Sequence, residues 1–315
     1  MVKEISETYG DGRPPAPLGA ALDDRITIHD RSDNRLPFSR GIMATSLLAT
    51  GVPTEDAYRL ASLIQQRLLA ARQNDVTAEE LVTAVHSILT NDAHEPDLAN
   101  RWTSWRRAKR SGRPVVIVLC GAPGTGKSTL ATRIAVRLDI TRVVTSDAIR
   151  DVLRTVVPSA VLPELHRSTF ELVVPNAPEP FSGFDRQCNA VGSAAVAIAD
   201  RLADEHRSLI LEGVHMLPGA TAGSLADHPA DPIVVERLIL QDDADRHADL
   251  LRKRQVSEPL RQGSRHLDGF ERIRSIQDHL IDVANQFAVE VVDSGDAGNL
   301  TQNIVEEIVR RLDHP

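Results

Sequence analysis

The chain has 315 residues, of which 42% are hydrophobic and 25% are charged, and its formal net charge at pH 7 is −8. This composition is typical of a soluble globular protein of about two domains, and the negative charge argues against a large nucleic-acid footprint. No apolar run approaches the roughly 18 residues of a membrane span, and there are only two cysteines. We therefore expect a cytoplasmic protein without a signal peptide, a membrane span or a disulfide framework.

The first third of the chain divides into three predicted segments. Residues 1–24 are rich in proline and glycine and are expected to be flexible. Residues 25–95 are predicted to form a small, mainly helical domain that starts with a short strand. Helical periodicity covers three stretches of it, 38–50, 54–71 and 77–89. Residues 96–112 are a basic linker helix with two tryptophans, Trp102 and Trp105, and such a helix more often packs its aromatic rings on a neighbour than binds nucleic acid.

The most specific motif follows a short apolar run at 115–120. It reads Gly-Ala-Pro-Gly-Thr-Gly-Lys-Ser over 121–128 and leads into a helical stretch at 129–138. A buried strand, a glycine-rich turn and a helix N-terminus together make a cradle of backbone N–H groups for a polyphosphate. In such a P-loop, Lys127 would reach the β- and γ-phosphates of ATP and the Ser128 hydroxyl would bind Mg²⁺. The predicted nucleotide-binding residues are Gly121, Ala122, Pro123, Gly124, Thr125, Gly126, Lys127, Ser128 and Thr129.

A second strand is expected over 142–146, and it is followed directly by Asp147 and Arg150. Because the functional crevice of a doubly wound sheet lies at the carboxyl ends of its strands, both residues are expected near the P-loop. Asp147 could accept the proton of an acceptor hydroxyl, and Arg150 with Arg154, one turn further on, could hold an anion. The alternative is that Asp147 only caps the following helix.

A long insert, 155–207, separates the second strand from a third over 208–212. Insertions at such a place often build an acceptor pocket. The candidate anion contacts within the insert are His166, Arg167 and Arg186. Taken singly, each of them also fits an ordinary surface residue. The third strand ends on Glu212, whose carboxylate could hold Mg²⁺ through water or help to position the acceptor.

The last two strands are expected over 233–240 and 288–292, with a cationic segment at 246–254 between them. In a phosphotransferase, such a segment can be a lid whose arginines reach the transferring phosphoryl group and exclude water. Arg252 and Arg254 are the candidates for this role. The alternative is a solvated helix with its own ion pairs.

Strands and helices alternate over residues 113–315, which predicts an α/β domain with a doubly wound parallel sheet. Several ordered segments resemble the 2-phosphoglycerate kinase family, most specifically LEGVHMLPG at 211–219 and GFDRQ at 183–187. The resemblance implies a P-loop kinase that uses ATP and Mg²⁺ to convert 2-phosphoglycerate into 2,3-bisphosphoglycerate. It also implies that residues 25–95 are an ATP-cone-like domain. The candidate nucleotide contacts in that domain are Arg35, Phe38 and Arg40.

The leading hypothesis is therefore phosphotransfer to a small phosphorylated acid. The predicted catalytic residues are Lys127, Asp147, Arg252 and Arg254. Two other functions stay open: a zeta-toxin-like or polynucleotide-type kinase with a similar Asp-x-x-Arg arrangement, and a non-catalytic ATP-binding switch. A GTPase switch is disfavoured because no Asn-Lys-x-Asp element occurs. The sequence also leaves open whether the protein is a homo-oligomer.

Overall fold

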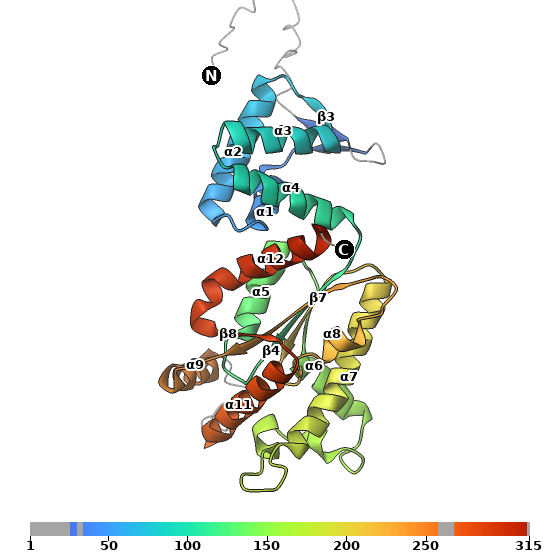
Figure 1. Cartoon of the computed structure of the whole chain (residues 1–315), viewed down its shortest axis with the longest axis vertical. Helices are drawn as coiled ribbons and strands as arrows, with labels where there is room; N and C mark the ends of the chain where they lie inside the picture. The colour runs from blue at the N-terminus through green and yellow to red at the C-terminus, as the bar shows by residue number, and fades with distance from the viewer. Residues whose placement is uncertain (1–25, 30–33, 258–267, 314–315) are drawn as a thin grey trace, which may run out of the picture.

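The computed structural model describes residues 26–29, 34–257 and 268–313 (Figure 1). The stretch 1–24, which was predicted to be flexible, lies outside these residues. None of the described helices is both long enough and apolar enough to cross a membrane.

The N-terminal part contains a small sheet and four helices. Strand β1 (Thr27–His29) lies in the middle of this sheet, antiparallel to β2 (Arg35–Pro37) and parallel to β3 (Asp75–Thr77). The four helices are α1 (Arg40–Leu48), α2 (Thr54–Ala70), α3 (Ala78–Asn91) and α4 (Pro96–Arg110). Thr77 and Glu80 form a capping box at the start of α3, which satisfies N–H groups that the helix itself cannot pair.

The two tryptophans of α4 are buried in different cores. Trp102 is fully buried among the apolar side chains of α1, α2 and α3, and its Nε1 donates a hydrogen bond of 2.9 Å to Ser46 Oγ. Trp105 instead packs with residues of the larger sheet and its helices. The prediction that these rings pack on neighbouring elements is confirmed, and the predicted linker helix contributes to both cores.

A five-stranded sheet forms the centre of the larger part. Its strands are all parallel and follow the order β5-β6-β4-β7-β8. In that order, their bounds are Val143–Thr145, Leu209–Gly213, Val115–Cys120, Ile233–Leu240 and Glu290–Asp293. Parallel neighbours need crossover connections, and helices supply them.

The side chains of β4 alternate between the two faces of this sheet, and both faces are covered. Val116 and Val118 pack in one core, whereas Ile117 and Leu119 pack in the other. The first core includes α7 (Ser182–Asp204) and α11 (Phe270–Gln286), and the second includes α5 (Lys127–Leu138) and α12 (Ala297–Asp313). The predicted doubly wound α/β fold is therefore confirmed.

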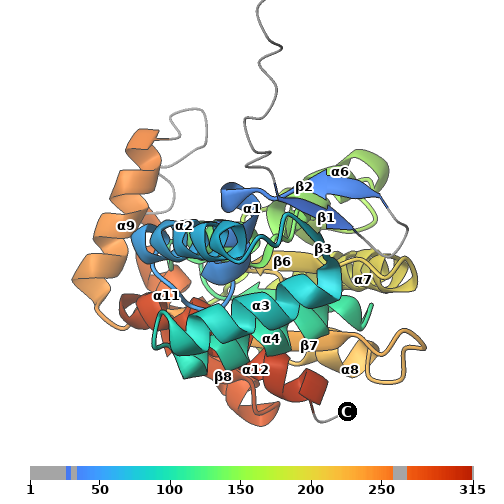
Figure 2. The same cartoon turned by 90° about the horizontal axis from the view of Figure 1, so that it is seen from above.

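The remaining helices follow β5, β6 and β7 in the chain. They are α6 (Ser146–Val156), α8 (Ala220–Ser224) and α9 (Ala244–Ser257), with 3-10 turns at Pro163–His166, Thr169–Leu172 and Ser294–Asp296. The long insert thus consists of two short turns followed by α7. Seen from above, α9 and α7 lie on opposite sides of the molecule (Figure 2).

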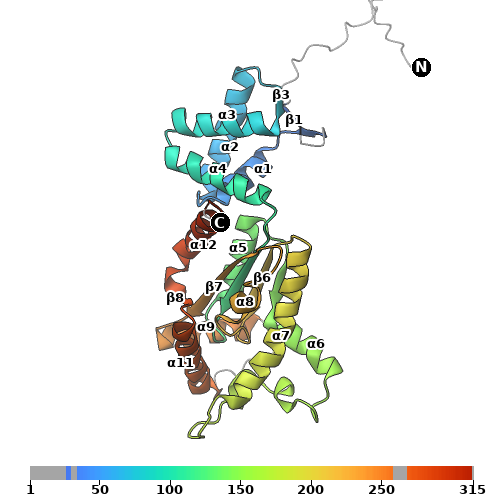
Figure 3. The same ribbon diagram turned by 45° about the vertical axis from the view of Figure 1, so that its right-hand side comes forward.

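Helix α5 connects the P-loop to the N-terminal helices. It begins at Lys127, beside the carboxyl end of β4, and runs back along the sheet. At its other end, Arg137 Nε donates to the Leu48 carbonyl at the end of α1 over 2.6 Å, and Lys109 of α4 pairs with Asp139 at 3.0 Å. Helices α1–α4 therefore stack at one end of the sheet, and α6, α9 and α11 lie toward the other end (Figure 1, Figure 3).

Candidate active site

The P-loop turns tightly at the end of β4. Gly121, Gly124 and Gly126 all have positive φ values, of 144°, 84° and 83°. At Gly121, a Cβ would lie 2.2 Å from the carbonyl oxygen of Ile239 in β7, so only glycine allows this approach. The loop then enters α5 with its backbone N–H groups unpaired by the helix, which suits an anion.

The side chain of Lys127 lies inside this loop. It is 7% exposed, and its Nζ donates a hydrogen bond of 2.7 Å to the carbonyl oxygen of Ala122. Thr125 Oγ1 lies 3.4 Å from the same nitrogen. The positive charge is thus held at the centre of the cradle that was predicted for the polyphosphate.

Ser128 and Glu212 meet beside Lys127. The Ser128 hydroxyl donates a hydrogen bond of 2.9 Å to Glu212 Oε1, and Glu212 is 5% exposed at the end of β6. The two residues come together because β6 and β4 are neighbours in the sheet. A hydroxyl and a carboxylate are oxygen ligands of the kind that Mg²⁺ prefers, so this pair fits a magnesium site.

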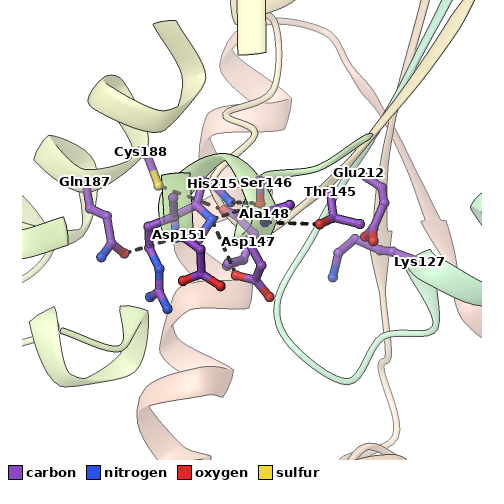
Figure 4. A network of polar contacts seen from close by, with 12 residues as sticks. Lys127, Thr145, Ser146, Asp147, Ala148, Asp151, Gln187, Cys188, Glu212 and His215 are labelled. Carbon is purple, nitrogen blue, oxygen red and sulfur yellow. Dashed lines mark hydrogen bonds and ion pairs between the residues drawn. The ribbon is translucent and has the colours of Figure 1, made fainter. Parts of the chain in front are cut away.

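Asp147 lies in the first turn of α6. The cap of this helix is Thr145, whose Oγ1 accepts a hydrogen bond of 3.2 Å from the Ala148 N–H. The alternative reading of Asp147 as the helix cap is therefore wrong, because the residue two places before it fills that position. The Asp147 carboxylate is 46% exposed and lies 3.9 Å from Nδ1 of His215. Figure 4 shows this carboxylate with Lys127 and Glu212 nearby.

Arg150 is the predicted anion contact with an unmet donor. Its Nη1 donates to the carbonyl oxygen of Arg167 at 3.1 Å. Its Nε is buried and has no hydrogen-bond partner within the described part of the chain. A buried donor without a partner is costly, and an anion would satisfy it. The guanidinium of Arg167 itself donates to the carbonyl oxygen of Glu171 at 2.7 Å.

Three other predicted anion contacts are engaged by the protein. Arg154 pairs with Asp151 at 3.3 Å, and Arg186 pairs with Glu164 at 2.8 Å while staying 58% exposed. His166 Nε2 lies 2.9 Å from the carbonyl oxygen that ends α6. The contact of Arg154 lies within α6, that of Arg186 lies within the insert, and that of His166 joins the insert to the end of α6. A role of the three side chains in binding an anion stays a prediction.

A family model described as "AAA domain" matches residues 116–175, which contain the P-loop and α6. The chain is 31% identical over 292 residues to a 2-phosphoglycerate kinase of Pyrococcus horikoshii, an alignment that covers 91% of this chain and 94% of that protein. The chain belongs to the 2-phosphoglycerate kinase family.

Other members of this family are similarly related. The enzyme of Pyrococcus furiosus is 30% identical over 88% of this chain and 91% of its own, and that of Methanopyrus kandleri is 29% identical over 91% and 88%. Among solved structures, a shikimate kinase of Acinetobacter baumannii aligns with 65% of this chain and 98% of its own, with a TM-score of 0.40 and 16% identity. The family relationship covers the N-terminal helices as well as the kinase sheet.

In this member of the 2-phosphoglycerate kinase family, α9 packs directly on the P-loop. His247 Nε2 donates to the Pro123 carbonyl oxygen at 2.7 Å, and a Cβ at Gly124 would lie 2.6 Å from a methyl group of Leu251. Arg252 is exposed and pairs with Asp249 at 2.5 Å, as the solvated-helix alternative describes. The side chain of Arg254 lies outside the described part. The predicted role of both arginines on the phosphoryl group stays a prediction.

A set of buried polar residues lies behind α6 and was not predicted as part of the site. Ser146, Gln187 and His215 are each at most 1% exposed and are joined by hydrogen bonds (Figure 4). Burial lowers the pKa of His215 to about 4, with Asp147 acting in the opposite direction, so the ring is neutral at pH 7. Gln187 and His215 fall in the two segments most typical of the family, but a sequence pattern does not reveal that two polar side chains meet inside a core.

Proposed function

We propose that the protein is an ATP- and Mg²⁺-dependent kinase that phosphorylates the hydroxyl group of 2-phosphoglycerate to give 2,3-bisphosphoglycerate. The observation that carries this proposal is the meeting of Ser128 and Glu212 beside Lys127, in a chain that is 31% identical to a named 2-phosphoglycerate kinase over nearly its whole length. The reaction class follows from the site, and the acceptor follows from the relatives.

The nucleotide half of the site has a clear division of roles. The N–H groups of the P-loop would bind the phosphates of ATP, and Lys127 would follow the negative charge on the β- and γ-phosphates. Ser128 and Glu212 would hold Mg²⁺, which neutralises the charge of the phosphates when it is bound. Lys127, Ser128 and Glu212 are already gathered at one edge of the sheet, and such preorganisation is a main source of stabilisation in phosphoryl transfer.

The acceptor half is built by α6 and the insert. Asp147 would orient the acceptor hydroxyl and take its proton as the new O–P bond to the γ-phosphorus forms, while the bond between that phosphorus and the β–γ bridging oxygen breaks and ADP leaves. Arg150, with its unmet buried donor, would bind the phosphate or carboxylate of the acceptor. Since the net charge of −8 repels an anionic acceptor at long range, such short-range contacts must provide the affinity.

The N-terminal part is proposed to be a separate, ATP-cone-like domain over residues 25–95 that regulates or supports the kinase domain over 113–315. Its position supports this division, because α1–α4 lie at the end of the sheet remote from α6 and α9 (Figure 1). Arg35, Phe38 and Arg40 stay the candidates for nucleotide contacts there.

ADP release against a panel of acceptors tests the proposal. The panel contains 2-phosphoglycerate, 3-phosphoglycerate, glycerate, sugar phosphates, nucleotide sugars, nucleosides and RNA with a 5′-hydroxyl, and phosphorus NMR identifies the product. We expect 2-phosphoglycerate to give the highest kcat/KM and 2,3-bisphosphoglycerate as product. Preference for RNA or nucleotide sugars would favour the zeta-toxin-like or polynucleotide-type kinase instead. Slow ATP hydrolysis with no accepted substrate would favour the ATP-binding switch.

A further inference from the structure

Ser146, His215 and Gln187 form a buried chain of hydrogen bonds behind the acceptor half of the site. Ser146 Oγ lies 2.8 Å from His215 Nδ1, and His215 Nε2 lies 3.2 Å from Gln187 Oε1 (Figure 4). The three residues come from α6, the segment after β6, and α7. These hydrogen bonds thus join three segments that are far apart in the sequence.

The partners of Gln187 give this chain a single direction. Its Nε2 donates to the carbonyl oxygens of Glu164 and Arg167, at 2.5 and 3.0 Å, so its Oε1 faces the histidine. His215 Nε2 must therefore carry the proton and donate it to Oε1. Its Nδ1 is then left as an acceptor, and the Ser146 hydroxyl donates to it. The imidazole is neutral and its tautomer is defined by its neighbours.

The packing around Ser146 leaves little freedom. Gly213, at the end of β6, has a φ of 144°, and a Cβ there would lie 1.9 Å from Ser146 Oγ. The end of β6 is thus in close contact with the start of α6, and His215 follows two residues later. Such close packing restrains the position of the first turn of α6.

The two ends of the hydrogen-bonded chain touch the two acceptor-binding groups of the proposed mechanism. At one end, Ser146 directly precedes Asp147 in α6. At the other end, the Arg167 carbonyl that accepts from Gln187 also accepts from Nη1 of Arg150. The hydrogen-bonded residues therefore lie between Asp147, which faces the acceptor hydroxyl in the proposed mechanism, and Arg150, which faces the acceptor anion.

We propose that His215 is a positioning residue which, together with Ser146 and Gln187, sets the distance between the Asp147 carboxylate and the Arg150 guanidinium. This inference rests on the proposed function, because it assigns the acceptor to these two groups. A fixed spacing selects acceptors whose hydroxyl lies next to an anionic group. It favours phosphoryl transfer to them by orienting Asp147 and Arg150, with no contact between His215 and the acceptor. His215 thereby determines acceptor specificity without touching the acceptor.

The test compares His215→Asn with Ser146→Ala. Asn keeps an acceptor close to the place of Nδ1 but cannot reach Gln187, whereas Ala removes the hydroxyl donor alone. We expect each variant to lower kcat/KM for 2-phosphoglycerate at least tenfold and to change the KM for ATP less than twofold. The double variant should lose no more than the worse single variant, because the residues act as one unit.

Matched controls are available on the same molecule. Ser193 Oγ donates only within α7, to the Asn189 carbonyl, so Ser193→Ala removes a hydroxyl outside the chain. The side chain of His228 is 5% exposed and lies beside Asp200 and Asp204. His228→Asn therefore makes the same histidine-to-asparagine substitution outside the hydrogen-bonded set. Both controls should keep the kinetics of the unchanged protein.

Equal losses of kcat/KM for ATP and for the acceptor, or near-normal acceptor kinetics in folded His215→Asn, would overturn the proposal. If that variant does not fold, Ser146→Ala alone decides the question by the same criteria.

A second readout separates this inference from the proposed function. Nitrogen-15 NMR of the histidine side chains in the full-length protein reports which ring nitrogen of His215 carries the proton, without any substrate. We expect the proton on Nε2 of His215. A proton on Nδ1 would contradict the proposed direction of the hydrogen bonds from Ser146 through His215 to Gln187. If the unchanged protein phosphorylates another acceptor of the panel, the kinetic test is run with that acceptor, and only the proposed substrate is lost. If it phosphorylates none, the proposed function and the positioning role both fail.

Discussion

The hydroxyl of Ser128 lies 2.9 Å from the carboxylate of Glu212, although 84 positions separate the two residues in the chain. The contact arises because β4 and β6 are adjacent parallel strands, so that the P-loop and the end of β6 open at the same edge. A pair of oxygen ligands at this edge is the expected setting for a magnesium ion that serves the phosphates.

Replacing Glu212 tests the metal role. Glu212→Gln keeps an acceptor for Ser128 and removes the negative charge, so the Mg²⁺ concentration at half-maximal rate should rise roughly tenfold, about 1.4 kcal/mol. ADP release across a magnesium titration measures this shift. The control is Glu271→Gln, an exposed carboxylate in the first turn of α11, which should leave the titration unchanged. An unaltered titration in Glu212→Gln would remove Glu212 from the metal site.

Lys127→Ala should leave the fold intact and lower turnover by several orders of magnitude, because several kcal/mol of transition-state stabilisation depend on this charge. The Nζ atom contacts the P-loop itself, so thermal unfolding should be compared before the rates are measured. Near-normal turnover by the folded variant would contradict a kinase reaction at this P-loop.

Asp147→Asn separates catalysis from helix stability. Since Thr145 caps α6, the change should leave the free energy of unfolding within about 0.5 kcal/mol and lower kcat more than tenfold through loss of the proton acceptor. Thr145→Ala gives the opposite pattern, with a stability loss of about 1 kcal/mol. Denaturant unfolding and initial rates measure the two effects. If Asp147→Asn keeps its rate, the carboxylate has no part in the reaction.

Arg150→Lys should raise the KM for the acceptor roughly tenfold, about 1.4 kcal/mol, and leave the KM for ATP unchanged. A lysine keeps the charge but loses the planar fork of donors that matches a phosphate or carboxylate. Initial rates with each substrate varied in turn provide the measurement. Equal weakening of both substrates would place Arg150 at the nucleotide.

The buried His215 predicts a pH dependence of stability. Its pKa is about 4 when folded, below the usual 6.5, so the unfolded chain binds more protons between these values. The contribution of the neutral His215 ring to the free energy of unfolding is therefore intact above pH 6.5 and is lost as the pH falls toward 4. Between pH 7 and pH 5 it amounts to about 2 kcal/mol. His215→Asn should lose correspondingly less stability than the unchanged protein over this interval. The free energy of unfolding, measured with denaturant, is plotted against pH for both proteins. If the two curves are parallel, the pKa of His215 is not lowered in the folded protein.

Local signals carried most of the successful predictions. The apolar runs at β4 and β7 predicted those strands to the residue, and the P-loop was predicted because its turn, glycines and helix start are contiguous. Strands β2 and β3 were missed because three residues are too few to show a period. Asp147 was offered as a cap because the sequence did not show where β5 would end and α6 would begin.

Long-range relationships were beyond the sequence. The position of Glu212 at a strand end predicted its place near Ser128, but the unmet donor of Arg150 depends on how the insert folds over α6. The pairing of His215 with Gln187 depends on packing between α7 and the segment after β6. Polar side chains of this kind are usually at the surface, so nothing local marks them as buried.

The hydrogen bond from Arg137 to the Leu48 carbonyl has a mechanical consequence. Helix α5 is a stiff rod of 12 residues whose first residue is Lys127 and whose last turn rests on α1. The phosphate cradle stands at the opposite end of this helix. One continuous helix thereby joins the N-terminal helices to the P-loop.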